Sequence, residues 1–168
     1  MNKKIVIYTD GSSIGNPGPG GLGIVMQYKD GDKIIKQKEI SEGYRLTTNN
    51  RMELLAVIKA LKMLNEKAKN LPIEIYTDSQ YVSNAINNGW LYSWVQKNFK
   101  KVKNPDLWIE LHKLLKQFKN ISFHWVRGHN NNTLNERCDT LAKQGAFSQQ
   151  KQIDSEYEQN NTSNDASR

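Results

Sequence analysis

The chain has 168 residues, of which 37% are apolar and 24% charged, so we expect one soluble domain with a single core. The single cysteine excludes an internal disulfide framework and favours a reducing, cytoplasmic location. No apolar run approaches the roughly 20 residues that span a bilayer, and the first residues lack the apolar region of a signal peptide. No membrane partner is therefore expected.

The net charge of +7 is uneven along the chain. From Ser148 onward two basic residues stand against four acidic ones, which gives this segment −2 and leaves +9 for the rest. A basic body favours a polyanionic partner, nucleic acid first, although ordinary solubility charge would give the same total. Residues 148–168 are mostly polar, so we expect a disordered acidic tail after a domain of residues 1–147.

Two short β-favouring runs each end in an aspartate. Ile5–Thr9 leads into Asp10, and Ile73–Thr77 leads into Asp78. The first run predicts a central strand that is buried on both faces. Ligands bind at the carboxyl ends of strands in open α/β sheets, so parallel pairing would bring both carboxylates to one edge. The alternative is that each aspartate only turns a strand end.

A loop rich in glycine and proline, Gly11–Gly21, follows the first aspartate. Its backbone amides and Asn16 can approach a phosphate closely, but a plain hairpin connection has the same composition. Two strands are predicted next, at 22–28 and 33–40, because an Asp-Gly turn typical of hairpins lies between them.

A helix from about Asn50 to Asn65 is predicted after a run of helix-start residues. At 100° per residue Arg51 lies on its polar edge, and Glu53 lies on its apolar side. A carboxylate there needs a partner, because an unpaired buried charge is prohibitively unfavourable. The alternative is that Glu53 favours the helix dipole and reaches solvent past the helix end.

The segment after a short predicted helix (79–87) combines aromatic and basic residues. Trp90 and Trp94 are one helical turn apart, and four lysines lie within seven residues, at positions 97, 100, 101 and 103. Aromatic rings interleaved with lysines favour contact with a nucleic-acid backbone. The alternative is a solvated amphipathic helix whose tryptophans belong to the core.

The last third of the chain is predicted to hold a helix (106–119), a strand (121–126) and a second helix. His124 on the strand is interpreted as a packed or surface residue. A capping box, Thr133 to Glu136, predicts the second helix start. On that helix Cys138 belongs to the packed face, and Asp139 lies on the rim of that face.

The carboxylates at strand ends and helix starts are Asp10, Glu53, Asp78 and Asp139. If all four converged at about 5 Å, each pair would repel by about 3 kcal/mol at an effective dielectric near 20. Six pairs would give roughly 20 kcal/mol, more than the 5–15 kcal/mol net stability of a typical domain. Such a cluster must stay partly protonated or hold cations, and hard oxygen ligands select magnesium or manganese.

Five motifs, in order along the chain, resemble those of bacterial ribonuclease HI. They are Tyr8–Ser12, Gly15–Gly20, Thr48–Glu53, Thr77–Val82, and Gly128-His129 followed by Asn135–Asp139. The resemblance covers about residues 1–147 and implies a ribonuclease H-like α/β fold. The implied sheet is five-stranded and mixed, with strand order 3-2-1-4-5 and flanking helices. The implied activity is endonucleolytic cleavage of the RNA strand of RNA–DNA hybrids, leaving 3′-hydroxyl and 5′-phosphate ends.

By position, the resemblance assigns roles to residues of this chain. Two metal ions, Mg²⁺ with Mn²⁺ as a possible substitute, would be held by Asp10, Glu53, Asp78 and Asp139. His129 would be the mobile catalytic histidine. Hybrid contacts are expected from Asn16, Thr48, Asn49, Asn50 and Gln80, and from the basic protrusion residues Trp90, Trp94, Lys97, Lys100, Lys101 and Lys103. We expect the protein to act as a monomer.

Two departures from the family's pattern affect substrate contacts. The protrusion, Trp90–Lys103, is shorter than in the best-known enterobacterial members. Leu46 stands where an arginine often precedes the Thr-Asn-Asn run, with Arg45 beside it. One alternative function is a module that binds hybrid or duplex RNA without cutting it, but a polyanion binder would favour losing the carboxylates. A resolvase or transposase core is another, and the lack of an extra DNA-binding domain disfavours it.

Overall fold

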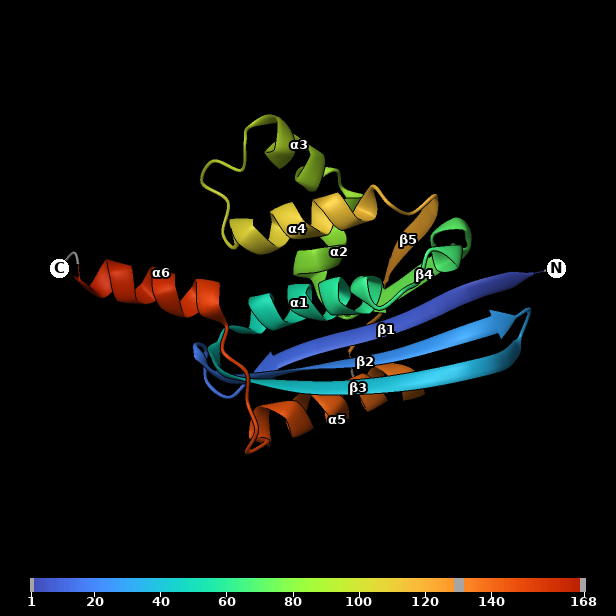
Figure 1. Cartoon of the computed structure of the whole chain (residues 1–168), viewed down its shortest axis with the longest axis horizontal. Coiled ribbons are helices and arrows are strands. Elements are labelled where there is room, and N and C mark those ends of the chain that lie inside the picture. The colour runs from blue at the N-terminus through green and yellow to red at the C-terminus, as the bar shows by residue number, and fades with distance from the viewer. Residues whose placement is uncertain (1, 129–131, 167–168) are drawn as a thin grey trace.

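The computed structural model describes residues 2–128 and 132–166, with side chains up to residue 160. Figure 1 shows one sheet with helices on both of its faces. The strands are β1 Lys3–Ser13, β2 Gly18–Asp30, β3 Lys33–Thr47, β4 Pro72–Thr77 and β5 Asn120–Trp125. The helices are α1 Asn49–Lys62, α2 Gln80–Asn87, α3 Trp90–Gln96, α4 Pro105–Leu115, α5 Thr133–Phe147 and α6 Ser155–Ala166, with a short 3-10 helix η1 at Lys67–Asn70.

The sheet has the strand order β3-β2-β1-β4-β5, which confirms the predicted order. β1 to β3 are antiparallel, whereas β1, β4 and β5 run parallel. In the β1–β4 register Tyr8 lies opposite Tyr76, and Thr9 lies opposite Thr77. The two predicted aspartate-ending strands are therefore parallel neighbours, and they end at the same edge of the sheet.

The core lies mainly between the sheet and the helices α1, α2 and α4, while α5 covers the other face over β1, β2 and β3 (Figure 1). Val6 and Ile7 point to opposite faces of β1 and are both buried, which confirms a central strand buried on two sides. This rigid strand carries Asp10 at its carboxyl end. No helix in the described part of the chain is long and apolar enough to cross a membrane.

Several element boundaries differ from the prediction, and two of the differences have a visible cause. β2 and β3 extend beyond the predicted strands, to Gly18–Asp30 and Lys33–Thr47, because they pair as one long antiparallel ribbon. The N-cap of α5 is Asn132, whose side chain accepts a hydrogen bond from the Asn135 amide at 3.0 Å. The capping box therefore placed the cap one residue too late.

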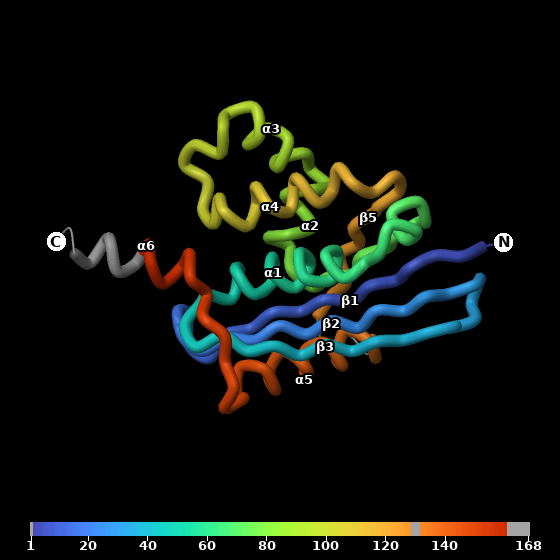
Figure 2. The backbone as a smooth tube through the Cα atoms, in the orientation of Figure 1, coloured from blue at the N-terminus to red at the C-terminus, as the bar shows by residue number. Residues whose placement is uncertain are grey.

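The C-terminal segment differs from the disordered tail that its composition predicts. The Gln152 amide donates to the Gly43 carbonyl at 2.8 Å, and the Arg45 amide donates to the Gln152 carbonyl at 3.0 Å. Figure 2 shows the chain passing the end of β3 on its way from α5 to α6. Asp154 is buried. The segment is held by contacts with residues 1–147, and amino-acid composition cannot predict such tertiary contacts.

Candidate active site

Three carboxylates converge at the edge where β1 and β4 end. Asp10 lies near the end of β1, Asp78 directly follows β4, and Glu53 lies in the second turn of α1. One oxygen of each lies within 4.8 Å of the others, and we call this group the acidic triad. Gly11 permits the approach, since a Cβ there would collide with the α1 backbone at Met52 and Glu53. The parallel pairing and the buried helix position explain why these residues meet.

Burial and mutual repulsion govern the protonation of the acidic triad. Asp10 and Glu53 are only 4% and 5% exposed. Burial, and then the charge of Asp78, raises the pKa of Asp10 to about 8. Burial, and then the charge of Asp10, raises the pKa of Glu53 well above its usual range. Three like charges at this distance favour a bound proton or a bound cation.

The residues of the acidic triad fit a divalent cation. Glu53 Oε2 is buried and has no hydrogen-bond partner among the described residues. The donors are carboxylate oxygens alone, the ligands that hard cations such as Mg²⁺ prefer. A cation there would satisfy the orphaned oxygen and remove the repulsion. Glu53 therefore does not reach solvent past the helix end, which was the alternative to a buried carboxylate.

Asp139, the fourth predicted ligand, lies on α5 outside the acidic triad. Its charge contributes to the raised pKa of Asp10, so it acts on the same site electrostatically. Its carboxylate forms an ion pair with Lys143, one turn further along α5, at 2.9 Å. In this structure Lys143 therefore supplies the positive charge next to Asp139.

The predicted contacts of the Thr-Asn-Asn run surround the start of α1. Thr48 is the N-cap, and its hydroxyl accepts a hydrogen bond from the Arg51 amide at 3.2 Å. The Asn49 amide donates to Asn16 Oδ1 at 3.2 Å, which joins the glycine-rich loop to the helix start. Asn50 is exposed. These residues are thus brought together, on the same helix end that carries Glu53.

The protrusion presents its cations to solvent. The side chains of Lys97, Lys100, Lys101 and Lys103 are all exposed, as is Gln80 at the start of α2. Trp94 is half-buried and packs edge-on against Trp108, with ring centroids 5.2 Å apart. Trp90 is 47% exposed. Of the two tryptophans, Trp94 serves the core and Trp90 remains available on the surface.

Of the two histidines considered in the sequence, the structure describes only His124. His129 lies outside the described residues. Gly128, which precedes it, lies beside the acidic triad, since a Cβ there would be 3.0 Å from Asp78 Oδ2. His124 stacks on Tyr76 with ring centroids 4.9 Å apart, and its Nε2 lies 2.9 Å from Ser122 Oγ. His124 is therefore a surface residue held by its strand neighbours, as predicted.

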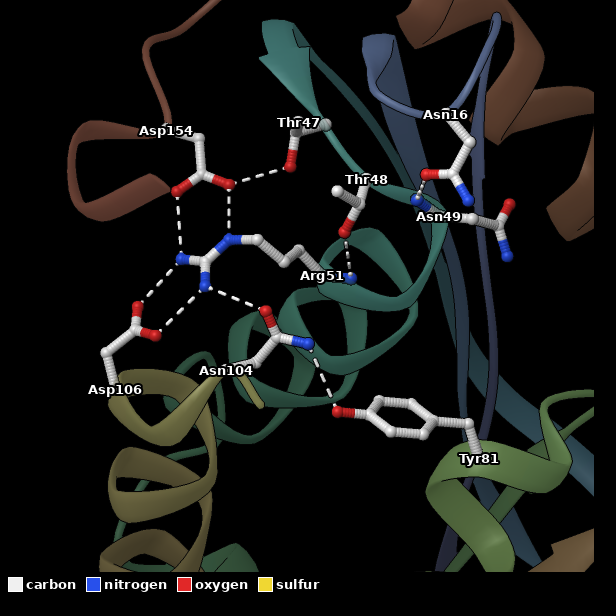
Figure 3. A network of polar contacts seen from close by, with 9 residues as sticks. All are labelled: Asn16, Thr47, Thr48, Asn49, Arg51, Tyr81, Asn104, Asp106 and Asp154. Carbon is white, nitrogen blue, oxygen red and sulfur yellow. Dashed lines mark hydrogen bonds and ion pairs between the residues drawn. The ribbon is translucent and has the colours of Figure 1, made fainter. Parts of the chain in front are cut away.

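A second buried charged cluster was not found from the sequence. Arg51, placed by periodicity on the polar edge of its helix, is only 3% exposed and is the centre of what we call the Arg51 junction (Figure 3). Its members are Arg51, Thr47, Asn104, Asp106 and Asp154. Asp154 is one of four acidic residues in the polar tail, and nothing local distinguished it or linked it to an arginine 103 positions earlier.

The fold and the site together define a class of protein. It is an α/β protein with a carboxylate cluster suited to a divalent cation at the carboxyl ends of its central parallel strands, and with an exposed lysine-rich protrusion. The chain belongs to the RNase H family, because the family model for RNase H matches residues 2–147.

Relatives from bacteria and a solved structure agree with this assignment. The chain is 50% identical to the ribonuclease H of Syntrophus aciditrophicus over 149 residues, which cover 86% of this chain and 81% of that protein. It is also 50% identical to the ribonuclease H of Helicobacter pylori strain HPAG1 over 151 residues, covering 90% and 99%. LC11-RNase H1, solved in complex with an RNA/DNA hybrid, is similar in structure with a TM-score of 0.64 and 28% identity, covering 85% of this chain and 96% of that one.

Proposed function

We propose that this chain is an endonuclease that hydrolyses the RNA strand of RNA–DNA hybrids and leaves 3′-hydroxyl and 5′-phosphate ends. The observation that carries the proposal is the acidic triad, whose buried carboxylates lie within 4.8 Å of one another in a member of the RNase H family. Carboxylates held this close lower stability without a cation, so their presence favours catalysis over mere binding of hybrid or duplex RNA.

Two divalent cations, Mg²⁺ with Mn²⁺ as a substitute, would be held by the acidic triad together with Asp139. When bound, such ions supply a Lewis acid for the scissile phosphate and lower the pKa of the attacking water. The chain itself supplies the ligands, positioned by the ends of β1 and β4 and by α1 and α5. The buried setting excludes bulk water from Glu53 and strengthens its electrostatic interactions.

The hybrid would be held by the polar groups around the start of α1 and by the protrusion. Asn16, Thr48, Asn49, Asn50 and Gln80 would contact the strands near the scissile phosphate. Lys97, Lys100, Lys101 and Lys103 would bind backbone phosphates without reading sequence, and the exposed ring of Trp90 would pack against the hybrid beside them. Trp94, which packs against the core, is not part of this contact. His129, whose chain neighbour Gly128 lies beside Asp78, would carry a proton to the leaving oxygen or assist product release.

Neither Leu46 nor its neighbour Arg45 is placed to replace the arginine that the family often has before the Thr-Asn-Asn run. Leu46 cannot bind a phosphate, and the guanidinium of Arg45 forms a bidentate pair with Glu158 of α6 at 2.8–3.1 Å. The phosphate contact that the family often makes at this point would therefore come from elsewhere. Residues 1–147 would form the catalytic domain. A monomeric state and a cytoplasmic location stay predictions from the sequence.

The proposal is tested with end-labelled substrates of one sequence: an RNA–DNA hybrid, an RNA duplex and a DNA duplex, each with and without Mg²⁺. We expect cleavage of the RNA strand of the hybrid alone, and only with a divalent cation, because the 2′-hydroxyl must be read on one strand. Tight binding of the hybrid without cleavage in Mg²⁺ or Mn²⁺ would favour the binding module. Equal cutting of all three duplexes would contradict the assigned substrate.

A further inference from the structure

The Arg51 junction has a defined geometry because every N–H group of Arg51 has a partner. Nε and Nη2 donate to the two oxygens of Asp154 at 2.7 and 2.9 Å. Nη1 and Nη2 donate to the two oxygens of Asp106 at 2.9 and 2.7 Å, and Nη1 also donates to Asn104 Oδ1 at 3.3 Å (Figure 3). A guanidinium has five donors in one rigid plane, so these contacts fix the directions of three separate segments.

Asp154 reaches Arg51 because the C-terminal segment attaches to the edge strand β3. The backbone hydrogen bonds of Gln152 to Gly43 and Arg45 add one residue of parallel pairing to the sheet edge. Asp154 then turns inward and also accepts a hydrogen bond from Thr47 Oγ1 at 2.7 Å. This buried aspartate thus holds the end of β3 and the start of α1 at the same time.

The segments joined at the junction are those that carry the proposed hybrid contacts. Thr47 directly precedes the run from Thr48 to Asn50. Asn104 follows the last lysine of the protrusion, and its amide donates to the Tyr81 hydroxyl at 3.1 Å. Tyr81 is the neighbour of Gln80 on α2. At 100° per residue Arg51 faces away from Asn49 and Glu53, so it holds this helix end from behind.

We propose that Asp154 is a positioning residue for hybrid binding, which acts through Arg51 and Thr47 on the helix start and through Asn104 on the foot of the protrusion. The inference rests on the proposed function. It assigns the C-terminal segment a part in substrate affinity that acts through the Arg51 junction rather than through the proposed hybrid contacts. Without Asp154 these segments must be ordered when the hybrid binds, which weakens binding.

A simple charge effect predicts the opposite result, which makes the inference testable. Removing a negative charge from a protein that binds a polyanion strengthens binding. Asp154→Asn should therefore tighten hybrid binding if charge alone matters, and weaken it if position matters. The matched control is Glu156→Gln, because Glu156 is exposed, lies two residues further along the same segment and loses the same charge.

The experiment measures KM and kcat on a labelled RNA–DNA hybrid, and the hybrid dissociation constant in EDTA, in the full-length chain. All measurements are made at 15 °C on proteins whose folding is checked by circular dichroism. For Asp154→Asn we expect KM and the dissociation constant to rise by about tenfold, as loosened segments must be ordered on binding. We expect kcat to change by less than about threefold, since Glu53 is also held by the fully buried Met52 and Leu54.

A triple variant, Arg51→Met with Asp106→Asn and Asp154→Leu, separates positioning from stability, since it also leaves no carboxylate without its partner. Replacing a buried ion pair with apolar groups often preserves stability, but it removes the hydrogen bonds to Thr47 and Asn104. We expect the melting temperature to recover relative to Asp154→Asn while KM stays raised. A KM that returns to the wild-type value with stability would overturn the inference. So would an Asp154→Asn variant that matches Glu156→Gln in hybrid affinity. A wild-type chain that leaves the hybrid uncut would instead overturn the proposed function.

Discussion

Arg51 and Glu53 lie two positions apart on α1 and are both almost fully buried. The surroundings of Arg51 stabilise its charge, whereas those of Glu53 destabilise its charge. Every donor of Arg51 meets an acceptor. Burial alone would lower the pKa of Arg51, but hydrogen bonds with Asp106 and Asp154 outweigh it and raise the pKa. Glu53 faces other carboxylates, so burial and repulsion raise its pKa and disfavour its charge.

The difference separates a buried charge that belongs to the fold from one that belongs to the chemistry. The Arg51 junction is complete in the protein alone, and breaking it by removing one partner should destabilise the chain. The acidic triad is incomplete without a cation, so neutralising one of its members should relieve repulsion. Mutations in the Arg51 junction should therefore lower stability, whereas mutations in the acidic triad should lower turnover.

The largest expected effect is the loss of turnover in Asp10→Asn. Removing this ligand should lower kcat by about a thousandfold or more, equivalent to about 4 kcal/mol in the barrier, because metal-ion catalysis supplies several kcal/mol. Hybrid binding should stay the same or tighten, since one negative charge is removed. Single-turnover rates at saturating Mg²⁺, with binding measured in EDTA, check both expectations.

The control for this variant is Asp106→Asn, which removes a carboxylate from the Arg51 junction instead. We expect it to lower the melting temperature while kcat stays within about threefold of wild type. If Asp10→Asn kept more than about a tenth of the wild-type rate, or if Asp106→Asn abolished turnover, the division between the two clusters would be wrong.

The two histidines extend the comparison to groups that titrate near neutrality. His129→Ala should lower kcat by roughly ten- to a thousandfold with little change in KM, in the range of proton-transfer effects. His124→Ala should leave kcat nearly intact in the folded protein, because Tyr76 and Ser122 account for the position of its ring. Steady-state kinetics of the two single variants decides the matter. A larger loss of turnover at His124 would show that the wrong histidine was assigned.

The stability of the metal-free protein should depend on pH in opposite directions in the two clusters. The pKa of Asp10 rises from 3.8 to about 8 on folding, so its stabilising contribution is present below about pH 4 and is lost as the pH approaches 8. Burial alone would raise the pKa of Asp106, but the hydrogen bonds from Arg51 lower it. Asp106 therefore stabilises the chain above its ordinary pKa, and that contribution is lost in acid.

Thermal unfolding in EDTA between pH 4 and 9 measures these contributions. Asp10→Asn should be more stable than wild type at pH 8 by on the order of a few kcal/mol, and similar to it at pH 4. Asp106→Asn should be less stable than wild type at neutral pH, with the difference shrinking in acid. Saturating Mg²⁺ should remove the advantage of Asp10→Asn. A difference in melting temperature between wild type and Asp10→Asn that stays constant from about pH 4 to 9 would contradict the raised pKa of Asp10.

Sequence patterns marked the three members of the acidic triad as candidates because each follows a local rule, and the family resemblance implied that they share one site. Asp10 and Asp78 end β-favouring runs, and Glu53 stands on the apolar side of a helix with a clear start. The fold order came from the family resemblance, since pairing of distant strands leaves no local signal. The Arg51 junction was missed for the same reason. Arg51 and Asp154 each look like ordinary surface charges, and only the tertiary fold joins them.

The smallest expected effect concerns Asp139, which is a predicted metal ligand like the acidic triad and has a counter-ion like the members of the Arg51 junction. Asp139 belongs to the predicted ligand set, yet it has a protein counter-ion in Lys143 at 2.9 Å. The Lys143 side chain is 57% exposed, so this ion pair contributes about 0.2–1 kcal/mol. A cation that recruits Asp139 competes with Lys143 for the charge of this carboxylate. Lys143→Gln should therefore lower the Mg²⁺ concentration for half-maximal cleavage by about 1.4- to fivefold.

Lys59→Gln, which breaks a comparable pair with Glu42, is the matched control and should leave the Mg²⁺ titration unchanged. If both variants shifted the titration equally, general charge would be the cause and the competition at Asp139 would be refuted.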